Sequence, residues 1–286
     1  NTTDHGSCLA GIDTVVYIIA PTSVVSAGGN VNICADNLSV PLGGNISGAS
    51  TTGTWSTMGS GTFVPDNQTL NGTYIPSASD SIAGTVTLVL TSTNTGSCTP
   101  ATDTMIVTIT NPAIVNAGVD QSTCSQGATV VMNGTVSGGT TTGTWSTLGT
   151  GTFTPSNTAL NATYTPSSAD LVAGTIQIIL TSTGNGICAA RTDTMVITII
   201  PMPVVSAGPD RVVCGNLTDV LLNGTVTGST TTGLWATTGS GTFTPNATTL
   251  NATYSMSSAD VIAGTVTLIL TTTNNTLCPA ISDTMI

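Results

Sequence analysis

Short stretches of the chain alternate between apolar and polar residues. Across residues 265–271, Val266, Leu268 and Leu270 fall on one face, and threonines dominate the other. A period of two with one apolar face is typical of an antiparallel strand that buries one side. Two earlier stretches keep this apolar face with the residues Val86, Leu88, Leu90, Ile176, Ile178 and Leu180. We therefore expect a half-buried strand in each of the three stretches.

A second alternating stretch follows each of these strands. Its apolar face carries Met105, Val107, Ile109, Met195, Ile197 and Ile199 in its two complete copies. The threonines between them are predicted to face outward; they are Thr104, Thr194 and Thr284. In the last third of the chain, we also expect strands within 219–226 and 250–254, with a turn or single helical loop at 258–260.

All of these features repeat with a period of 90 residues. Trp55, Trp145 and Trp235 keep this step, and so do two series of cysteines, Cys8, Cys98, Cys188, Cys278 and Cys34, Cys124, Cys214. A fixed period without insertions indicates a tandem array of similar small domains. We expect repeats at 21–110, 111–200 and 201–286, the last cut within its final strand. Residues 1–20 match the C-terminal strands of a preceding repeat.

Each repeat predicts an all-β domain. About seven short strands, with turn signals every 8 to 12 residues, favour a two-sheet Greek-key β-sandwich. The tryptophans, together with Tyr74, Tyr164 and Tyr254, are expected in the cores. Short, proline-containing junctions at Asn111-Pro112 and 201–203 favour stiff connections. Since both ends fall within a repeat, we expect either part of a longer array or a polymer in which neighbouring molecules complete the broken units.

Composition excludes several classes of partner. Only 5% of the residues are charged, and the net charge is −11 because Arg191 and Arg211 are the sole basic residues apart from one histidine. Binding to nucleic acid, or to an anionic membrane surface, needs clustered Lys or Arg. No apolar run approaches the ~20 residues of a membrane helix, so membrane insertion is not expected.

The high mean hydropathy of +0.36 raises the question of what keeps the surface wetted. Thr and Asn side chains are one answer, and a carbohydrate coat is another. The chain contains twelve Asn-x-Ser/Thr triplets, many of which arise by chance in so threonine-rich a sequence. The candidates that we retain for N-glycosylation are Asn71, Asn133, Asn161, Asn223 and Asn251.

The cysteines indicate an oxidising, exported setting. Seven cysteines in fixed register, without a C-x-x-C pair, favour disulfides over zinc. The pairing that we favour lies within each repeat, joining Cys34 to Cys98, Cys124 to Cys188 and Cys214 to Cys278, with Cys8 bonded to an upstream partner. A rival pairing, Cys8 with Cys34 and so on, would connect neighbouring repeats and leave Cys278 over.

A family resemblance rests on three kinds of segment. VVSAGPDRVVCG, GTWSTLGTGTFTPSNTALNATYTPSSADLVAGT and GICAARTDTMVIT resemble the PKD-like or Ig-like repeats of giant cell-surface proteins of Bacteroidota, including adhesins and gliding proteins. The resemblance covers essentially the whole chain and implies export and a stalk-like role. It also implies O-glycosylation at Asp-Ser/Thr followed by an apolar residue, a motif that falls on Thr14, Ser81, Thr104, Thr194 and Thr284. An aspartate that caps a turn before the strand explains the motif equally well.

Catalytic chemistry is missing from the sequence. There is no phosphate-binding loop, no Ser-His-Asp set and no paired acids, and the single histidine, His5, lies in an incomplete repeat. Asp120 and Asp210 could bind calcium near a junction, but turn capping explains them better because they lack a dense spacing of oxygen ligands. We expect no enzyme activity, no cofactor and no metal.

Three functions remain open. The favoured one is an extracellular structural stalk or filament on the cell surface, glycosylated and formed by self-association or by neighbouring repeats of one long chain. The outward apolar residues Val89, Ile106, Val196 and Ile269 make self-association plausible. The alternatives are an adhesin that binds a glycan or surface partner, which predicts exposed aromatic residues in one repeat only, and an accessory region of a secreted enzyme.

Overall fold

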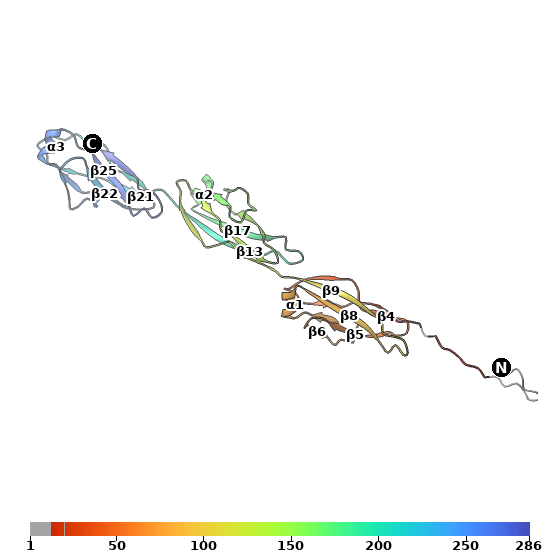
Figure 1. Cartoon of the computed structure of the whole chain (residues 1–286). Coiled ribbons are helices and arrows are strands. Elements are labelled where there is room, and N and C mark those ends of the chain that lie inside the picture. Colours follow the sequence, from red (N-terminus) through yellow and green to blue (C-terminus); the bar gives the residue numbers. More distant parts are fainter. Residues whose placement is uncertain (1–12, 20) are drawn as a thin grey trace, which may run out of the picture. The chain divides into compact units, whose positions relative to one another are not determined.

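The computed structural model describes residues 13–19 and 21–286, and it consists of three β-sandwiches of about 90 residues (Figure 1). His5 and Cys8 lie outside the described residues. The contacts of the chain divide it into two compact units, Asn1–Pro112 with Asn185–Ala189, and Ala113–Gly184 with Ala190–Ile286. The predicted all-β sandwich fold is confirmed.

The first sandwich has nine strands and one short helix. A four-stranded sheet has the order β2-β9-β8-β5, and the other strands form the sheets β3-β7-β6 and β1-β4. The bounds are β1 Val24–Ser26, β2 Val31–Cys34, β3 Val40–Pro41, β4 Asn45–Ser47, β5 Thr52–Thr57, β6 Thr62–Val64, β7 Thr73–Ile75, α1 Ala78–Ala83, β8 Thr85–Thr93 and β9 Thr102–Thr110.

The second sandwich repeats this topology, with the sheets β11-β18-β17-β14, β12-β16-β15 and β10-β13. Most of its neighbouring strands pair antiparallel, but β11 pairs parallel to β18, as β2 does to β9. The bounds are β10 Ala113–Asn116, β11 Gln121–Cys124, β12 Val130–Val131, β13 Thr135–Gly138, β14 Thr142–Thr147, β15 Thr152–Thr154, β16 Thr163–Thr165, α2 Ser168–Ala173, β17 Thr175–Thr183 and β18 Thr192–Ile200.

The third sandwich departs from the pattern at one edge of its main sheet. That sheet is β22-β25-β26, and residues 211–214, which match β2 and β11, form no strand. The bounds are β19 Val204–Ser206, β20 Asp219–Leu221, β21 Thr225–Thr227, β22 Thr232–Thr237, β23 Thr242–Thr244, β24 Thr253–Ser255, α3 Ser258–Ala263, β25 Leu268–Thr273 and β26 Ser282–Met285.

Three of the expected strands need correction here. The strand expected at 250–254 begins only at Thr253 as β24, because residues 250 and 251 lie in a turn. The stretch 219–226 is divided between β20 and β21, because Leu222–Gly224 leaves the first sheet before the chain joins the second. The strand expected from Thr265 begins at Leu268 as β25. Residues 265–267 lie opposite no strand, whereas the matching Thr85–Thr87 pair with β9. The helical turn expected at 258–260 is the start of α3.

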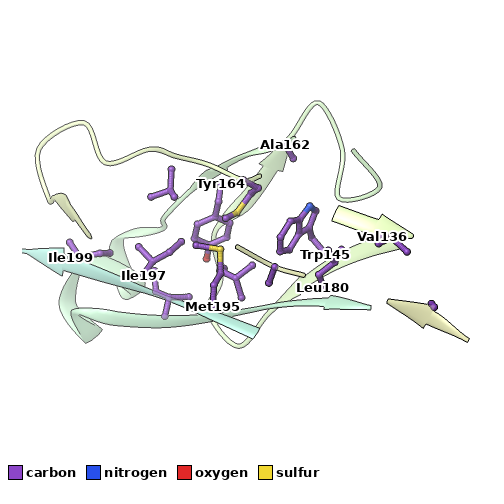
Figure 2. Packing of buried hydrophobic residues seen from close by; sticks show 14 residues of the cluster. Val136, Trp145, Ala162, Tyr164, Leu180, Met195, Ile197 and Ile199 are labelled. Carbon is purple, nitrogen blue, oxygen red and sulfur yellow. The ribbon is translucent and has the colours of Figure 1, made fainter. Parts of the chain in front are cut away.

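Each core is organised around one tryptophan and one tyrosine. Figure 2 shows Trp145 and Tyr164 with Leu180, Met195 and Ile197, all fully buried in the second sandwich. The indole Nε1 of Trp145 donates to the carbonyl oxygen of Ala159 at 3.1 Å, so the one polar atom of the ring is satisfied. The predicted core positions of the tryptophans and tyrosines are confirmed in all three repeats.

Candidate functional site: the repeated cysteine junctions

We call the place where two successive repeats meet a junction. The first half of each junction is a cysteine at the end of a strand that pairs parallel to its neighbour. Cys34 is the last residue of β2 and pairs with Thr110, the last residue of β9. Cys124 ends β11 and pairs with Ile200 in the same way. Because the strands are parallel, each cysteine lies at the end of its sandwich from which the chain passes into the next repeat.

The second half is a cysteine in the loop between the two long strands of the following repeat. Cys188 lies between β17 and β18 and is bonded to Cys34, with a Cα–Cα distance of 5.1 Å. Cys124 is bonded to Cys278, with a Cα–Cα distance of 5.0 Å. Each bond spans 154 residues, which is the spacing of 64 within a repeat plus one period of 90. Both disulfides therefore join one repeat to the next.

The pairing predicted within each repeat is wrong. Cys98 precedes β9, and Cys34 pairs with the far end of this nine-residue strand. At ~3.3 Å per residue, the two cysteines are roughly 27 Å apart, far beyond the ~5.5 Å that a disulfide allows. The same argument excludes Cys124 with Cys188. The pair Cys214 with Cys278 is excluded because Cys278 is bonded to Cys124 and Cys214 is free. The rival series also fails, since Cys124 and Cys188 have other partners; its first pair involves Cys8, outside the described residues.

Two described cysteines are free, Cys98 and Cys214. Cys98 is partly buried, with its Sγ 3.9 Å from the carbonyl oxygen of Pro21. The bonded Cys278 holds the equivalent place in its repeat, with its Sγ 3.5 Å from the carbonyl oxygen of Pro201. Cys214 is exposed and follows the residues that form no strand.

The predicted glycosylation positions are mostly accessible. Thr104, Thr194 and Thr284 are exposed, which confirms the strand phase inferred from the sequence. Ser81 is half-buried, and its hydroxyl donates to the carbonyl oxygen of Ser77 at 3.1 Å, so this position is the least suited to carry a sugar. The other candidates are exposed, namely Thr14, Asn71, Asn133, Asn161, Asn223 and Asn251.

The aspartates of the O-glycosylation motif have a structural role. Oδ2 of Asp103 accepts a hydrogen bond from the backbone N–H of Ala27 at 2.8 Å. In the other two repeats, Oδ2 of Asp193 accepts from the N–H of Ala117, and Oδ2 of Asp283 accepts from the N–H of Ala207, both at 2.8 Å. These bonds fix the Ala-Gly turn at the start of each repeat against the last strand. These aspartates lie within the last strand and hold a turn 76 residues earlier in the chain, so they do not cap the turn before their own strand as the alternative explanation expected. Glycosylation of the adjacent threonine stays a prediction.

Asp120 and Asp210 each bind a backbone N–H group 76 residues later in the chain, which differs from the expected capping of a local turn. Asp120 Oδ1 accepts from the N–H of Val196, and Asp210 Oδ1 from the N–H of Ile286, both at 2.8 Å. Among the described residues, no group of three or more acidic, cysteine or histidine side chains is arranged to hold a metal ion. In the same part of the chain, no helix is long and apolar enough to cross a membrane.

A buried carboxylate network recurs in every repeat. The hydroxyl of Tyr74 donates to Asp80 at 2.8 Å, and Asp80 also accepts from the N–H groups of Ser60 and Ser77. Burial raises the pKa of Asp80, but these hydrogen bonds outweigh it, so its pKa lies below the ordinary value. Burial also raises the pKa of Tyr74. Because the network is internal and fully paired, it stabilises the fold and offers no reactive group.

The matching network of the third sandwich has the same geometry. Tyr254 donates to Asp260 at 2.9 Å, and the N–H groups of Ser240 and Ser257 donate to it at 2.8 and 3.0 Å. Chiefly through these two backbone hydrogen bonds, the pKa of Asp260 falls to about 2. The sequence pattern placed the tyrosine in the core but did not reveal its aspartate partner six residues later.

Comparison with known proteins shows a likeness of fold. A mutated variant of a three-domain Ig fragment of titin matches with a TM-score of 0.57 at 10% identity, covering 94% of this chain and 98% of that fragment. An I-band fragment of titin matches with a TM-score of 0.56 at 11% identity, covering 94% of this chain and 98% of that fragment. A mouse cadherin-23 fragment of three extracellular domains matches with a TM-score of 0.45 at 12% identity, covering 93% of this chain and 97% of the fragment. No family model matches the chain. No curated protein matches it either.

Proposed function

We propose that this chain is an extracellular structural protein, part of a stalk or filament on a cell surface, whose role is to transmit tension through disulfide-linked repeats. The observation that carries the proposal is the pair of disulfides Cys34–Cys188 and Cys124–Cys278. Each adds a second covalent connection beside the peptide linker between successive repeats. A protein that only presents a binding surface has no need of such a connection.

The two disulfides create a shortened covalent path along the chain. A force that pulls on the two ends passes from Cys34 directly to Cys188, and from Cys124 directly to Cys278. The loops closed by these bonds overlap between residues 124 and 188. Most of the chain is therefore bypassed. Unfolding of the first or the third sandwich releases little extra length, and unfolding of the second releases at most the segment between Cys124 and Cys188.

Within the second sandwich, the force acts on a favourable arrangement of strands. Tension applied at Cys124, the last residue of β11, and at Cys188, which precedes β18, slides β11 against β18, because the two strands are parallel and are loaded at opposite ends. Four residue pairs, from Gln121–Ile197 to Cys124–Ile200, then resist together rather than one after another. In the first sandwich, β2 pairs with β9 in the same way, but β9 lies in the part of the chain that the disulfide bypasses.

The proposed location outside the cell rests on the cysteines and the surface. Disulfides persist in oxidising compartments and are rare in the cytosol of most organisms. The resemblance to PKD-like or Ig-like surface repeats of Bacteroidota agrees with this location. The exposed threonines Thr104, Thr194 and Thr284 support, as part of the proposal, O-linked glycans that cover a surface poor in charge.

The proposal includes no catalytic activity. It also does not favour adhesion by an aromatic patch, because Trp and Tyr are buried in each sandwich and Phe63, Phe153 and Phe243 are equally half-buried. In the three described sandwiches, no single repeat presents aromatic residues that the others lack.

Single-molecule force spectroscopy tests the proposal. The chain is pulled from its two ends in oxidising buffer and again after reduction. With both disulfides intact, the maximum extension should be on the order of 370 Å, against roughly 1,000 Å for the reduced chain. The reduced chain should also show separate unfolding steps of roughly 300 Å for whole sandwiches.

The matched control replaces the two free cysteines, Cys98→Ser with Cys214→Ser, and should extend like the oxidised parent. Replacement of Cys34 and Cys124 by Ser should give the extension of the reduced chain without any reductant. If the oxidised parent extends to the full length, the bypass does not exist and the proposed role in tension is wrong.

A further inference from the structure

The third sandwich contains an apolar groove at the edge that the other two sandwiches fill. The groove has a volume of about 400 Å³, and its lining includes Val213, Val220, Val266, Leu268 and Ile286. In the first two sandwiches, the C-terminal halves of β9 and β18 occupy the corresponding place. In the third, β26 comprises only Ser282–Met285.

Both backbone edges of the groove lack a strand partner. Residues 211–214 match β2 and β11 but form no strand, although the N–H of Arg211 still donates to the carbonyl oxygen of Ile286 at 2.8 Å. Across the groove, residues 265–267 match Thr85–Thr87, which pair with β9 in the first sandwich. Unpaired edges of this kind are templates for the addition of a strand.

The complete sandwiches indicate which side chains the groove accepts. Val107 and Ile109 in β9, and Ile197 and Ile199 in β18, point into the core and are at most 4% exposed. The residues between them, Thr108 and Thr198, face outward and are exposed. The groove therefore fits an extended segment with apolar residues at two alternating positions.

The chain itself carries such a segment. Residues 13–19 adopt no regular structure, and Tyr17, Ile18 and Ile19 are 87%, 90% and 92% exposed. By the period of 90, Tyr17 corresponds to Val107, and Ile19 corresponds to Ile109. A run of exposed apolar residues in the phase of an inward-facing strand matches the groove in chemistry and in spacing.

The two free cysteines support the same pairing independently. Cys98 lies beside Pro21, immediately after this segment, as Cys278 lies beside Pro201 after β18. Cys214 corresponds to Cys34 and Cys124, which pair with the last residues of β9 and β18. A segment seated in the groove would bring its own Cys98 to the neighbouring Cys214.

We propose that Tyr17–Ile19 of one molecule completes the third sandwich of a second molecule, and that Cys98 of the first molecule then forms a disulfide with Cys214 of the second. Tyr17 and Ile19 enter the core, Ile18 faces outward, and the bond reproduces the Cys34–Cys188 junction between molecules. This head-to-tail assembly rests on the proposed function and gives the stalk a way to grow from separate chains.

The covalent step requires an oxidant, which we assign to a low-molecular-weight disulfide. The thiolate of Cys214 attacks one sulfur of this disulfide, forms a mixed disulfide and releases one small thiol. The thiolate of Cys98 then attacks the Cys214 sulfur and releases the second small thiol. Two protein thiols are oxidised, one small disulfide is reduced to two thiols, and the two thiol protons leave to solvent or to the released thiolates.

The test uses the whole chain in a Cys8→Ser background, so that Cys98 and Cys214 are its only unpaired cysteines. The protein is incubated with oxidised glutathione and examined by non-reducing electrophoresis and light scattering. We expect a ladder of covalent multimers, in which mass spectrometry of digested protein finds Cys98 linked to Cys214. Both Cys98→Ser and Cys214→Ser should abolish the ladder.

Two variants separate a seated strand from random oxidation. Tyr17→Thr with Ile19→Thr removes the two inward side chains and should reduce multimer yield at least about tenfold. The matched control Ile18→Thr changes the outward position to the residue found at 108 and 198, and should assemble like the parent. All three positions are highly exposed, so the substitutions leave the described sandwiches folded.

A self-complemented chain provides the opposite test. Addition of Ile-Thr-Ile-Ile after Ile286, copied from residues 197–200, should fill the groove and prevent assembly. The proposal is overturned if the parent stays monomeric, if the extended chain still assembles, if Ile18→Thr fails like the double variant, or if Cys98–Cys98 and Cys214–Cys214 links dominate. None of these results affects the disulfides within one chain, so the proposed tension-bearing role is tested separately by extension of the monomer.

Discussion

The second and third sandwiches repeat the same sequence pattern at a step of 90 residues, yet they differ at one edge. β17 spans nine residues in the second, whereas its counterpart β25 spans six. Gln121–Cys124 forms β11, whereas residues 211–214 form no strand. Since Val212 and Val213 favour a strand at least as strongly as Ser122 and Thr123, propensity does not explain the difference.

What the third sandwich lacks is the neighbouring strand that pairs with β11 and β17 in the second sandwich. β18 continues to Ile200 and pairs on one side with β11 and on the other with β17. β26 ends at Met285, and the residues that would flank its continuation are left without pairing. The consequence reaches the core, because Ile176 is 4% exposed but the matching Val266 is only partly buried. In these repeats, a strand forms where a partner strand exists.

The largest expected effect comes from truncation of the central tryptophan. Trp145→Ala should cost the second sandwich about 3–5 kcal/mol, because a fully buried indole is replaced by a cavity. Trp235→Ala should remove a similar amount from the third sandwich, which starts with less core burial and should therefore unfold. Native-state hydrogen exchange of β17 and β25 measures the two separately.

Trp55→Ala is the control for this comparison, since the first sandwich is complete at the same edge and Trp55 is also fully buried. It should behave like Trp145→Ala. If Trp235→Ala leaves β25 as protected as the parent, then the open edge does not weaken the third sandwich, and the contrast drawn above is wrong.

The second effect comes from the junction disulfides. Replacement of Cys124 and Cys278 by Ser should destabilise the third sandwich by about 2–4 kcal/mol, because the bond restrains the loop before β26 and closes a long loop in the unfolded chain. The melting temperature of the third sandwich, followed by calorimetry, should fall. The equivalent double variant at Cys34 and Cys188 should leave the third sandwich unchanged.

Cys98→Ser with Cys214→Ser matches these variants in chemistry but removes no bond within one chain. Its melting curve should overlay that of the parent at protein concentrations too low for assembly. A loss equal to that of the Cys124 and Cys278 variant would mean that the destabilisation comes from serine at these positions and not from the missing crosslink.

The sequence predicts most of the fold and little of the junction. Alternation predicts the inward faces of Leu180 and Ile197, and the period predicts equal cores around each tryptophan, because both features are local or repeated. The disulfide partners depend on which end of the sandwich each loop occupies. The parallel pairing of β2 with β9 determines the end of the sandwich at which Cys34 lies. The alternation of apolar and polar residues does not reveal this pairing. A two-residue pattern also does not show that Tyr164 reaches Asp170.

The third effect concerns the buried tyrosine and aspartate pair of each sandwich and the pH dependence of stability that it causes. The pKa values of Asp170 and Asp260 lie below their ordinary value in the folded protein, and that of Asp260 is about 2. Each therefore contributes stability that is fully present above about pH 4 and is lost as the pH falls through the folded pKa. Urea unfolding between pH 5 and pH 2 should show falling stability, and Asp260→Asn should flatten this dependence in the third sandwich.

Substitution of the tyrosine tests the same network at neutral pH. Tyr164→Phe and Tyr254→Phe each remove one hydroxyl that donates to the carboxylate, and each should cost about 1–3 kcal/mol. The two costs should agree within error, because the network is complete in both sandwiches. A much smaller cost for Tyr254→Phe would mean that the open groove admits water to Asp260.

The smallest effect is expected at the helix caps, where the two sandwiches are alike. The side chains of Ser167 and Ser257 accept from the N–H groups of Asp170 and Asp260, and both positions complete a capping box. Ser167→Ala and Ser257→Ala should each cost about 1 kcal/mol. Hydrogen exchange of the amides of α2 and α3 measures the two costs. Equal values would confine the difference between the sandwiches to the strand edge, whereas a larger loss in α3 would extend the weakness of that edge into the neighbouring helix.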